Sequence, residues 1–88
     1  MNVEFTNAFN KQLSEIRDEK LLKEIAGCVK QVMAADSIKE ISQLKKLKGF
    51  KTAFRIRTGT YRIGVFIEKQ DAIFAAILHR KDIYRKFP

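Results

Sequence analysis

The sequence predicts an α+β fold, a two-layer sandwich in which a helical hairpin packs on one face of a mainly antiparallel sheet. Three observations favour this class. Apolar residues recur three and four positions apart between residues 9 and 33, as they do in amphipathic helices. Residues 52–78 hold three apolar segments of strand length that short turns separate. No linker or internal repeat divides the 88 residues, so we expect one domain over residues 1–88.

The N-terminal part of the chain is predicted to form one strand and two helices. Asn2–Phe5 alternates polar and apolar side chains and should form a strand, and Thr6 can cap a helix that ends at about Arg17. Asp18 can cap a second helix from residue 19 to about residue 35. The link between the helices is short, which implies an antiparallel pair. The apolar stripe of the second helix comprises Leu22, Ile25, Val29 and Val32.

The C-terminal part is predicted to form three consecutive strands. A helical turn within residues 38–48, with Leu44 and Leu47 pointing inward, should end at Gly49. The strands should cover residues 52–57, 61–67 and 72–78, and the first two alternate. The third is continuously apolar, which indicates a strand covered on both faces. The predicted order is therefore strand, helix, helix, strand, strand, strand.

Positive charge is concentrated in the second half of the chain. Residues 1–40 carry six Lys and Arg against seven Asp and Glu, whereas residues 41–88 carry twelve against three. If the helices cover one face of the sheet, the other face should stay open and carry three arginines. Such a patch indicates a polyanionic ligand, and the alternative is a basic surface that only keeps the protein soluble. The basic residues between positions 41 and 67 are Lys45, Lys46, Lys48, Lys51, Arg55, Arg57 and Arg62.

The composition argues against several other classes of protein. No apolar run approaches the roughly 20 residues of a membrane span. The first residues lack the basic and apolar regions of a secretory signal, so we expect a cytoplasmic protein without membrane partners. One cysteine, Cys28, and one histidine cannot complete a standard zinc site, and we expect no metal or other cofactor. Cys28 lies on the apolar stripe, which favours a buried small residue over a reactive thiol.

Two segments of the chain resemble a known family. They are LKGFKTAFRIRTGTYRIGVF at residues 47–66 and HRKDIY at residues 79–84. With the strand and helices before them, they resemble the RelE-like mRNA interferases of the RelE/ParE toxin superfamily. The resemblance implies the toxin of a type II toxin-antitoxin system, a metal-independent endoribonuclease that cuts mRNA on the ribosome and inhibits translation. It also implies three partners, which are a small cognate antitoxin, the ribosome and mRNA.

The same resemblance implies which residues act. Two basic residues precede the hairpin in this family, one arginine follows the hairpin tyrosine, another follows the last strand, and an aromatic residue stands near the C-terminus. Many relatives also carry a histidine at the end of the last strand. In the order just given, the matching positions are Arg55 and Arg57, Arg62, Arg80, Tyr84 and His79.

Attack of a 2′-OH on the neighbouring phosphate needs two proton transfers and stabilisation of negative charge. Arginines stay protonated at neutral pH, so they can bind phosphate and stabilise charge but cannot accept protons. His79 is the only side chain that ordinarily titrates near neutral pH, and Tyr84 is the second candidate. Their alternatives are a histidine bonded to backbone and a tyrosine that packs the C-terminal segment. We predict a catalytic set of Arg62, His79, Arg80 and Tyr84, and an RNA-binding set of Lys45, Lys46, Lys48, Lys51, Arg55 and Arg57.

Two other functions remain open at this stage. A ParE-like toxin would share the fold and inhibit DNA gyrase by binding, without a nuclease site. A basic module without activity could bind RNA or an acidic antitoxin segment. The combination of the arginines with His79 and Tyr84 favours the nuclease. The sequence predicts neither the codon preference nor the oligomeric state.

Overall fold

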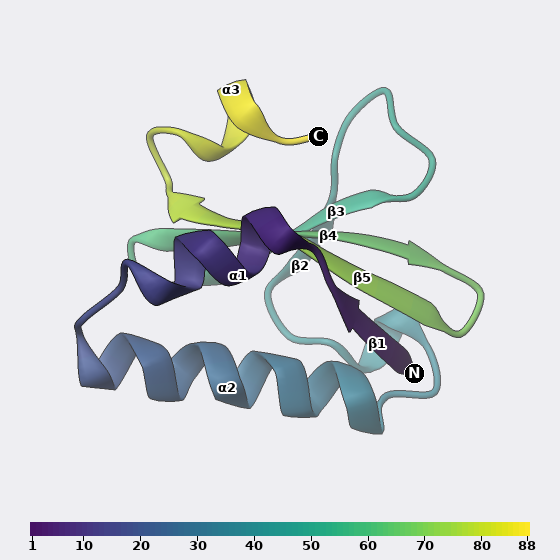
Figure 1. Ribbon diagram of the computed structural model, residues 1–88. Coiled ribbons are helices and arrows are strands. Elements are labelled where there is room, and N and C mark those ends of the chain that lie inside the picture. The colour runs from purple at the N-terminus through teal and green to yellow at the C-terminus, as the bar shows by residue number, and fades with distance from the viewer.

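The computed structural model describes all 88 residues and contains one five-stranded sheet (Figure 1). The strand order is β1-β5-β4-β3-β2, and only β1 and β5 are parallel. This mainly antiparallel sheet with a helical hairpin on one face confirms the predicted fold class. The elements are β1 (Asn2–Phe5), α1 (Asn7–Ser14), α2 (Glu19–Ala34), β2 (Leu44–Lys46), β3 (Ala53–Thr58), β4 (Tyr61–Glu68), β5 (Asp71–His79) and α3 (Ile83–Lys86), with a 3₁₀ turn at Ile38–Glu40.

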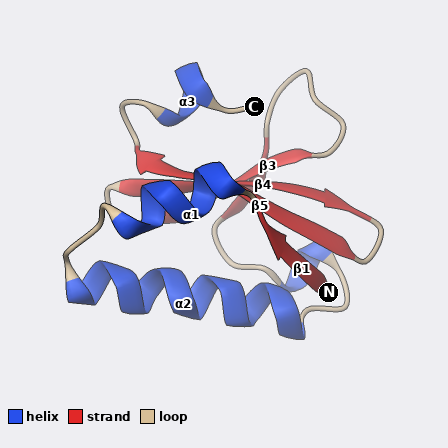
Figure 2. Ribbon diagram, in the orientation of Figure 1, coloured by secondary structure: helices blue, strands red, loops and turns tan.

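The two long helices begin where the sequence predicts (Figure 2). The Thr6 hydroxyl accepts a hydrogen bond from the Phe9 N–H at 3.1 Å, and the Asp18 carboxylate accepts from the first turn of α2. Each cap satisfies amide groups that the helix itself leaves without partners. α1 ends at Ser14, one turn earlier than expected. No helix in the chain is both long and apolar enough to span a lipid bilayer.

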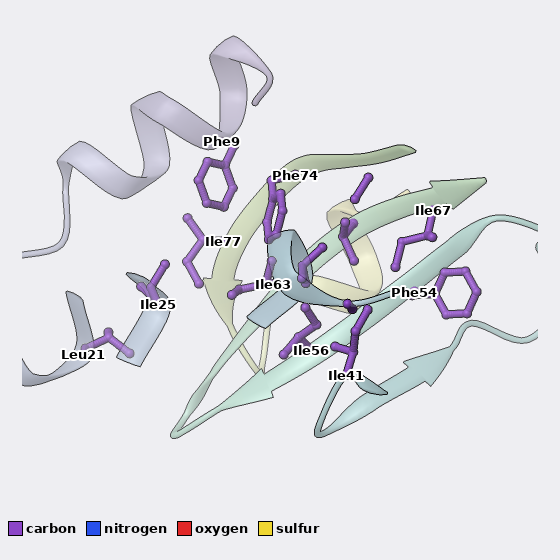
Figure 3. Packing of buried hydrophobic residues seen from close by; sticks show 14 residues of the cluster. Phe9, Leu21, Ile25, Ile41, Phe54, Ile56, Ile63, Ile67, Phe74 and Ile77 are labelled. Atoms are coloured by element: carbon purple, nitrogen blue, oxygen red, sulfur yellow. The ribbon is translucent and has the colours of Figure 1, made fainter. Parts of the chain in front are cut away.

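The main core lies between α1, α2 and the sheet (Figure 3). Ile25 of α2 is 2% exposed, Val32 is fully buried and Val29 packs against the same cluster, which confirms these three members of the predicted stripe. Leu22 does not join the cluster, and Leu21 is buried there in its place. Leu22 and Val29, at the edge of the stripe, are half-buried. The buried members of this cluster are Phe9, Leu21, Ile25, Val32, Ala35, Ile41, Phe54, Ile56, Ile63, Val65, Ile67, Ala72, Phe74 and Ile77.

The opposite face of the sheet is partly covered, and the expectation that it stays open is wrong. The chain turns after β5 and lays the single-turn helix α3 over β4 and β5 (Figure 1). Ile83 and Phe87 are buried there, in a second cluster with Leu47, Ala53 and Ala76. The continuously apolar β5 is thus covered on both faces, as its composition indicates.

One local feature explains how the C-terminal segment packs so closely on the sheet. Gly64 of β4 has no side chain, and a Cβ atom built there would lie 2.6 Å from the ring of Phe87. The glycine therefore makes the space that the ring occupies.

Between residues 38 and 48 the predicted helical turn is present only at Ile38–Glu40, and it is followed by the edge strand β2, which was not predicted.

Candidate functional site

The face that carries α3 also carries the predicted arginines, in register across the strands. Arg55 of β3 lies opposite Lys45 of β2, and Arg57 lies opposite Arg62 of β4. Side chains paired in this way project from the same face of a sheet, so four cations lie together. Like charges directly opposite each other destabilise a sheet, and nothing in the core requires them. The arrangement is suited to an anion.

Little of the positive charge is neutralised within the protein. The chain carries 18 Lys and Arg, yet its one ion pair joins Arg85 to Asp82 at 2.6 Å, with Arg85 largely exposed. Arg57 and Arg80 are exposed, and their guanidinium groups make no hydrogen bond within the chain. These groups keep all of their donors for an external ligand.

Arg55 connects three elements of the site. Its Nε donates to the Tyr84 hydroxyl at 3.3 Å, and its Nη1 donates to the Gln43 carbonyl oxygen at 2.8 Å. The guanidinium is thereby fixed between the segment before β2 and helix α3. Because the phenol oxygen of Tyr84 accepts from Arg55, the phenolic proton is left for another acceptor.

Tyr84 is held at this point by its neighbours rather than by its own packing. Ile83 is fully buried and Phe87 is 5% exposed, whereas the Tyr84 residue is 59% exposed. The two buried side chains anchor α3, and Tyr84 projects from it toward Arg55. The alternative that Tyr84 packs the C-terminal segment is therefore wrong, because Ile83 and Phe87 do so.

Arg62 lies at the hairpin end of the cationic face. Its Nη1 donates to the carbonyl oxygens of Gly59 and Tyr61 at 3.0 and 2.9 Å. These bonds hold the guanidinium over the turn between β3 and β4. Residues two apart on a strand are separated by about 6.6 Å, so the Arg57–Arg62 pair lies one such step from the Arg55–Tyr84 pair. Both pairs can contact one short stretch of an extended polyanion.

His79 lies on the other side of the sheet at the same end. It is paired with Tyr61, and their ring centroids are 5.7 Å apart in an edge-to-face arrangement. Tyr61 packs against the helix-side core, so the histidine ring also faces that side. The Lys81 N–H donates to Nδ1 at 3.2 Å, and the neutral ring therefore carries its proton on Nε2. This is the backbone-bonded arrangement that the sequence left as an alternative.

Arg80 follows His79 directly and lies beyond the end of β5. Its backbone N–H donates to the Thr60 carbonyl oxygen at 2.8 Å, which fixes the main chain beside the β3–β4 hairpin turn. Arg80 and Arg62 therefore flank the same hairpin turn. The structure brings together Arg62 with Arg57 and Arg55 with Tyr84, while it separates His79 from both pairs by the thickness of the sheet.

A cleft opens beside the cationic face, between β2, the loop after it and the C-terminal segment. Its volume is about 530 Å³. The predicted RNA-binding residues Lys45, Lys46 and Lys48 line it, and Lys51 is exposed on the same loop. The sequence interpretation missed this cleft, and it missed the exposed ring of Phe50 in its wall. The available signal for an exposed ring was the position of Phe50 within the basic stretch LKGFKT.

Cys28 does not belong to this site. Burial raises the pKa of the Cys28 thiol, a hydrogen bond with Thr58 lowers it, and the nearby charge of Glu24 raises it. The net rise disfavours the reactive thiolate, as expected for a residue packed against the core. No three His, Cys, Asp or Glu side chains lie close enough together to hold a metal ion.

Comparison with known proteins gives consistent matches along the whole chain. Residues 3–84 match the family model of the ParE toxin of the type II toxin-antitoxin system parDE. The chain is 35% identical over 89 residues to Toxin RelE3 of Methanocaldococcus jannaschii, with all of both chains covered.

Solved structures agree with these sequence matches. The chain is similar to the crystal structure of a RelB-RelE antitoxin-toxin complex from Methanococcus jannaschii, with a TM-score of 0.79 and 33% identity over 96% of this chain and 98% of that one. It also has the same fold as a chain of the YoeB dimer from Staphylococcus aureus, with a TM-score of 0.73 and 17% identity over 90% of this chain and 95% of that one.

Proposed function

This chain belongs to the RelE/ParE superfamily of type II toxin-antitoxin toxins, and from that premise we propose that it is an endoribonuclease that cuts mRNA on the ribosome. The observation that carries the proposal is the cationic face with one phenol in it. Arg55, Arg57 and Arg62 project from one face, and the hydroxyl of Tyr84 is bonded to Arg55 at 3.3 Å. A face that only bound an anion would need no exposed phenol bonded to one of its arginines.

The roles of the residues follow from their chemistry. Arg62 and Arg80 are proposed to stabilise the negative charge that develops on the phosphate during attack by the 2′-OH. Tyr84, which lies on the cationic face, is proposed as the first proton carrier, since arginines cannot accept protons. His79 is proposed as the second proton carrier, and this role requires its ring to leave the Lys81 N–H that occupies Nδ1 and to reach the cationic face around the end of β5. Side chains fill every role in this scheme, so the proposed reaction requires no metal.

The remaining basic residues are proposed to hold the RNA backbone. Lys45, Lys46, Lys48 and Lys51 lie on β2 and the loop after it, next to Arg55 and Arg57 on β3. The site has few groups that could impose the bent geometry needed for in-line attack. The ribosome is proposed to supply that geometry by holding the mRNA, so free RNA should be cut poorly.

A small cognate antitoxin is proposed as the second partner. The similar structure from Methanococcus jannaschii contains an antitoxin, RelB, together with a toxin, RelE. The uncompensated positive charge of this chain suits an acidic segment of such a protein. An antitoxin that covered the cationic face would exclude RNA from it.

One observation favours a second function, inhibition of DNA gyrase. The family model that matches residues 3–84 describes ParE toxins. Against this, the curated relative with 35% identity over its full length is a RelE toxin.

Induced expression separates the two functions. We expect rapid loss of protein synthesis and cleaved mRNA after induction, without early DNA damage. Induction of the SOS response, with gyrase inhibited and mRNA intact, would move the protein to the gyrase inhibitors. An Arg80→Ala/Tyr84→Phe double variant is the control, because the nuclease mechanism predicts that it loses toxicity while keeping its fold.

Binding of RNA should depend on phosphate contacts made by the cationic face. Removal of one contact flattens the dependence of log affinity on log salt concentration by roughly 0.7 to 0.9. Arg55→Ala should show this change in ribosome or RNA binding, and Lys30→Ala, on the exposed face of α2, should not. If Arg55→Ala leaves both the affinity and the salt slope unchanged, Arg55 lies outside the RNA footprint.

A further inference from the structure

The cleft beside the cationic face combines lysines with two exposed aromatic rings. Phe50 is 49% exposed and Tyr84 is 59% exposed. Neither ring belongs to either of the two core clusters. Leu47 and Phe87, both buried, form an apolar floor. The full lining is Lys45, Lys46, Leu47, Lys48, Phe50, Tyr84, Phe87 and Pro88.

Phe50 is placed at the cleft by a tight turn. Its N–H donates to the Leu47 carbonyl oxygen at 3.3 Å, and Gly49 between them has a φ of +87°. This left-handed conformation suits glycine and closes a four-residue turn. The turn leaves the phenylalanine residue about half exposed, and Lys48 and Lys51 lie close to it in the chain. A large apolar ring in such a position contributes little to folding, and its exposure instead makes it available to a ligand.

The two kinds of side chain match the two parts of a nucleotide. Aromatic rings stack on nucleobases of any sequence, and lysines contact the phosphates on either side. The cleft is continuous with the proposed RNA-binding face, because Tyr84 lines the cleft and its hydroxyl is bonded to Arg55. An RNA strand that lies on Arg55 and Arg57 can therefore place its next base in the cleft.

We propose that this cleft is a nucleobase subsite for single-stranded RNA, in which Phe50 stacks on one base and Lys45 and Lys48 hold the adjacent phosphates. The inference rests on the proposed RNA substrate and adds a residue that contacts a base rather than a phosphate. An acidic peptide is the competing occupant. The continuity of the cleft with the face proposed to bind RNA, through Tyr84 and Arg55, favours a base over a peptide.

The first test measures affinity with the full chain and no ribosome. The probe is a short single-stranded RNA with 2′-O-methyl groups, which cannot be cut by attack of the 2′ oxygen. Phe50→Ala should weaken binding about 5- to 150-fold, the scale for loss of one stacked base. The salt slope should stay at the wild-type value, because no charge is removed. Phe50→Tyr keeps the ring and should bind like wild type, and Met33→Ala, an exposed apolar residue on α2, is the matched control.

The second test reports stacking directly. The chain contains no tryptophan, so Phe50→Trp introduces a single fluorescent reporter at the subsite. Saturation with the RNA should quench that tryptophan. An oligonucleotide of equal length and charge that lacks its bases should bind with the same salt dependence but without quenching, and Phe50→Ala should not weaken its binding.

The outcomes separate this inference from the proposed nuclease function, because both tests measure binding without cleavage. RNA binding that Phe50→Ala leaves within twofold of wild type, or a Phe50→Trp protein that binds RNA without quenching, would overturn the subsite. Failure of the wild-type protein to bind the RNA would overturn it as well. If Phe50→Ala instead weakens binding of an acidic peptide and leaves RNA binding unchanged, the cleft is a protein docking site. Melting temperatures of the variants should match that of wild type, since Phe50 lies outside both cores.

Discussion

Tyr84→Phe and His79→Gln should each lower the rate of mRNA cleavage on programmed ribosomes by about 10²- to 10⁴-fold, the usual scale for loss of a general acid or base. Phenylalanine keeps the ring of Tyr84, so only the hydroxyl that bonds to Arg55 is removed. Arg80→Ala should lose about 10²- to 10³-fold, because it removes a donor to the developing charge. The measurement is a single-turnover rate with saturating protein, together with ribosome affinity, which should change little.

The chain offers a matched control for the hydroxyl. It has two tyrosines, and Tyr61 packs against the helix-side core, so Tyr61→Phe should cleave at the wild-type rate. The two proposed proton carriers lie on opposite faces of the sheet, so a comparison of Tyr84→Phe with His79→Gln shows which face carries out the proton transfer. A loss at Tyr84→Phe with none at His79→Gln would assign the chemistry to the cationic face alone. Wild-type rates for both variants would refute the proton-transfer assignment.

Ile25→Asp should prevent folding of the domain. Ile25 is 2% exposed and lies in the main core between α2 and the sheet. An unpaired buried charge costs about 3–5 kcal/mol, and loss of the large side chain adds about 2–5 kcal/mol, against a typical total stability of about 5–15 kcal/mol. A thermal melt followed by circular dichroism should show no cooperative transition.

The neighbouring residue provides the control for that experiment. Ala26 is exposed on the same turn of α2, so Ala26→Asp introduces the same charge without burying it. Its melting temperature should stay within a few degrees of wild type, as surface substitutions usually change stability by about 0.5 kcal/mol or less. A cooperative melt of Ile25→Asp close to the wild-type temperature would contradict the core assignment.

The elements with a clear local pattern of apolar residues, whether periodic or continuous, are those that the sequence predicts well. The start of α2, the strand Asn2–Phe5 and the last strand agree with the structure to within about a residue or two at each end. Their patterns are local, since the caps at Thr6 and Asp18 and the spacing of buried residues are set by neighbours in the chain. The register that places Arg57 opposite Arg62 also follows from a short turn.

The features that the sequence does not reveal depend on contacts between distant residues. α3 is one turn long, and it exists because Ile83 and Phe87 find a face of the sheet to cover. Gly64 leaves the space that the Phe87 ring fills, but a glycine within a strand does not by itself identify the side chain that packs on it. Because this segment covers the face, the arginines border a cleft, where the sequence suggested a flat open surface.

The pairing of β1 with β5 constrains when the protein can fold during its synthesis. Asn2 pairs with Asp71 and Phe5 with Phe74, so the first strand made has no partner until the last strand has been made. A contact across that span requires a large loop to close first, which is typical of slow-folding topologies. The main core includes Phe74 and Ile77 as well as Phe9, and it cannot close around a shorter nascent chain. The cationic face is therefore assembled only after β5 and the segment that carries Tyr84 and Phe87 have been made.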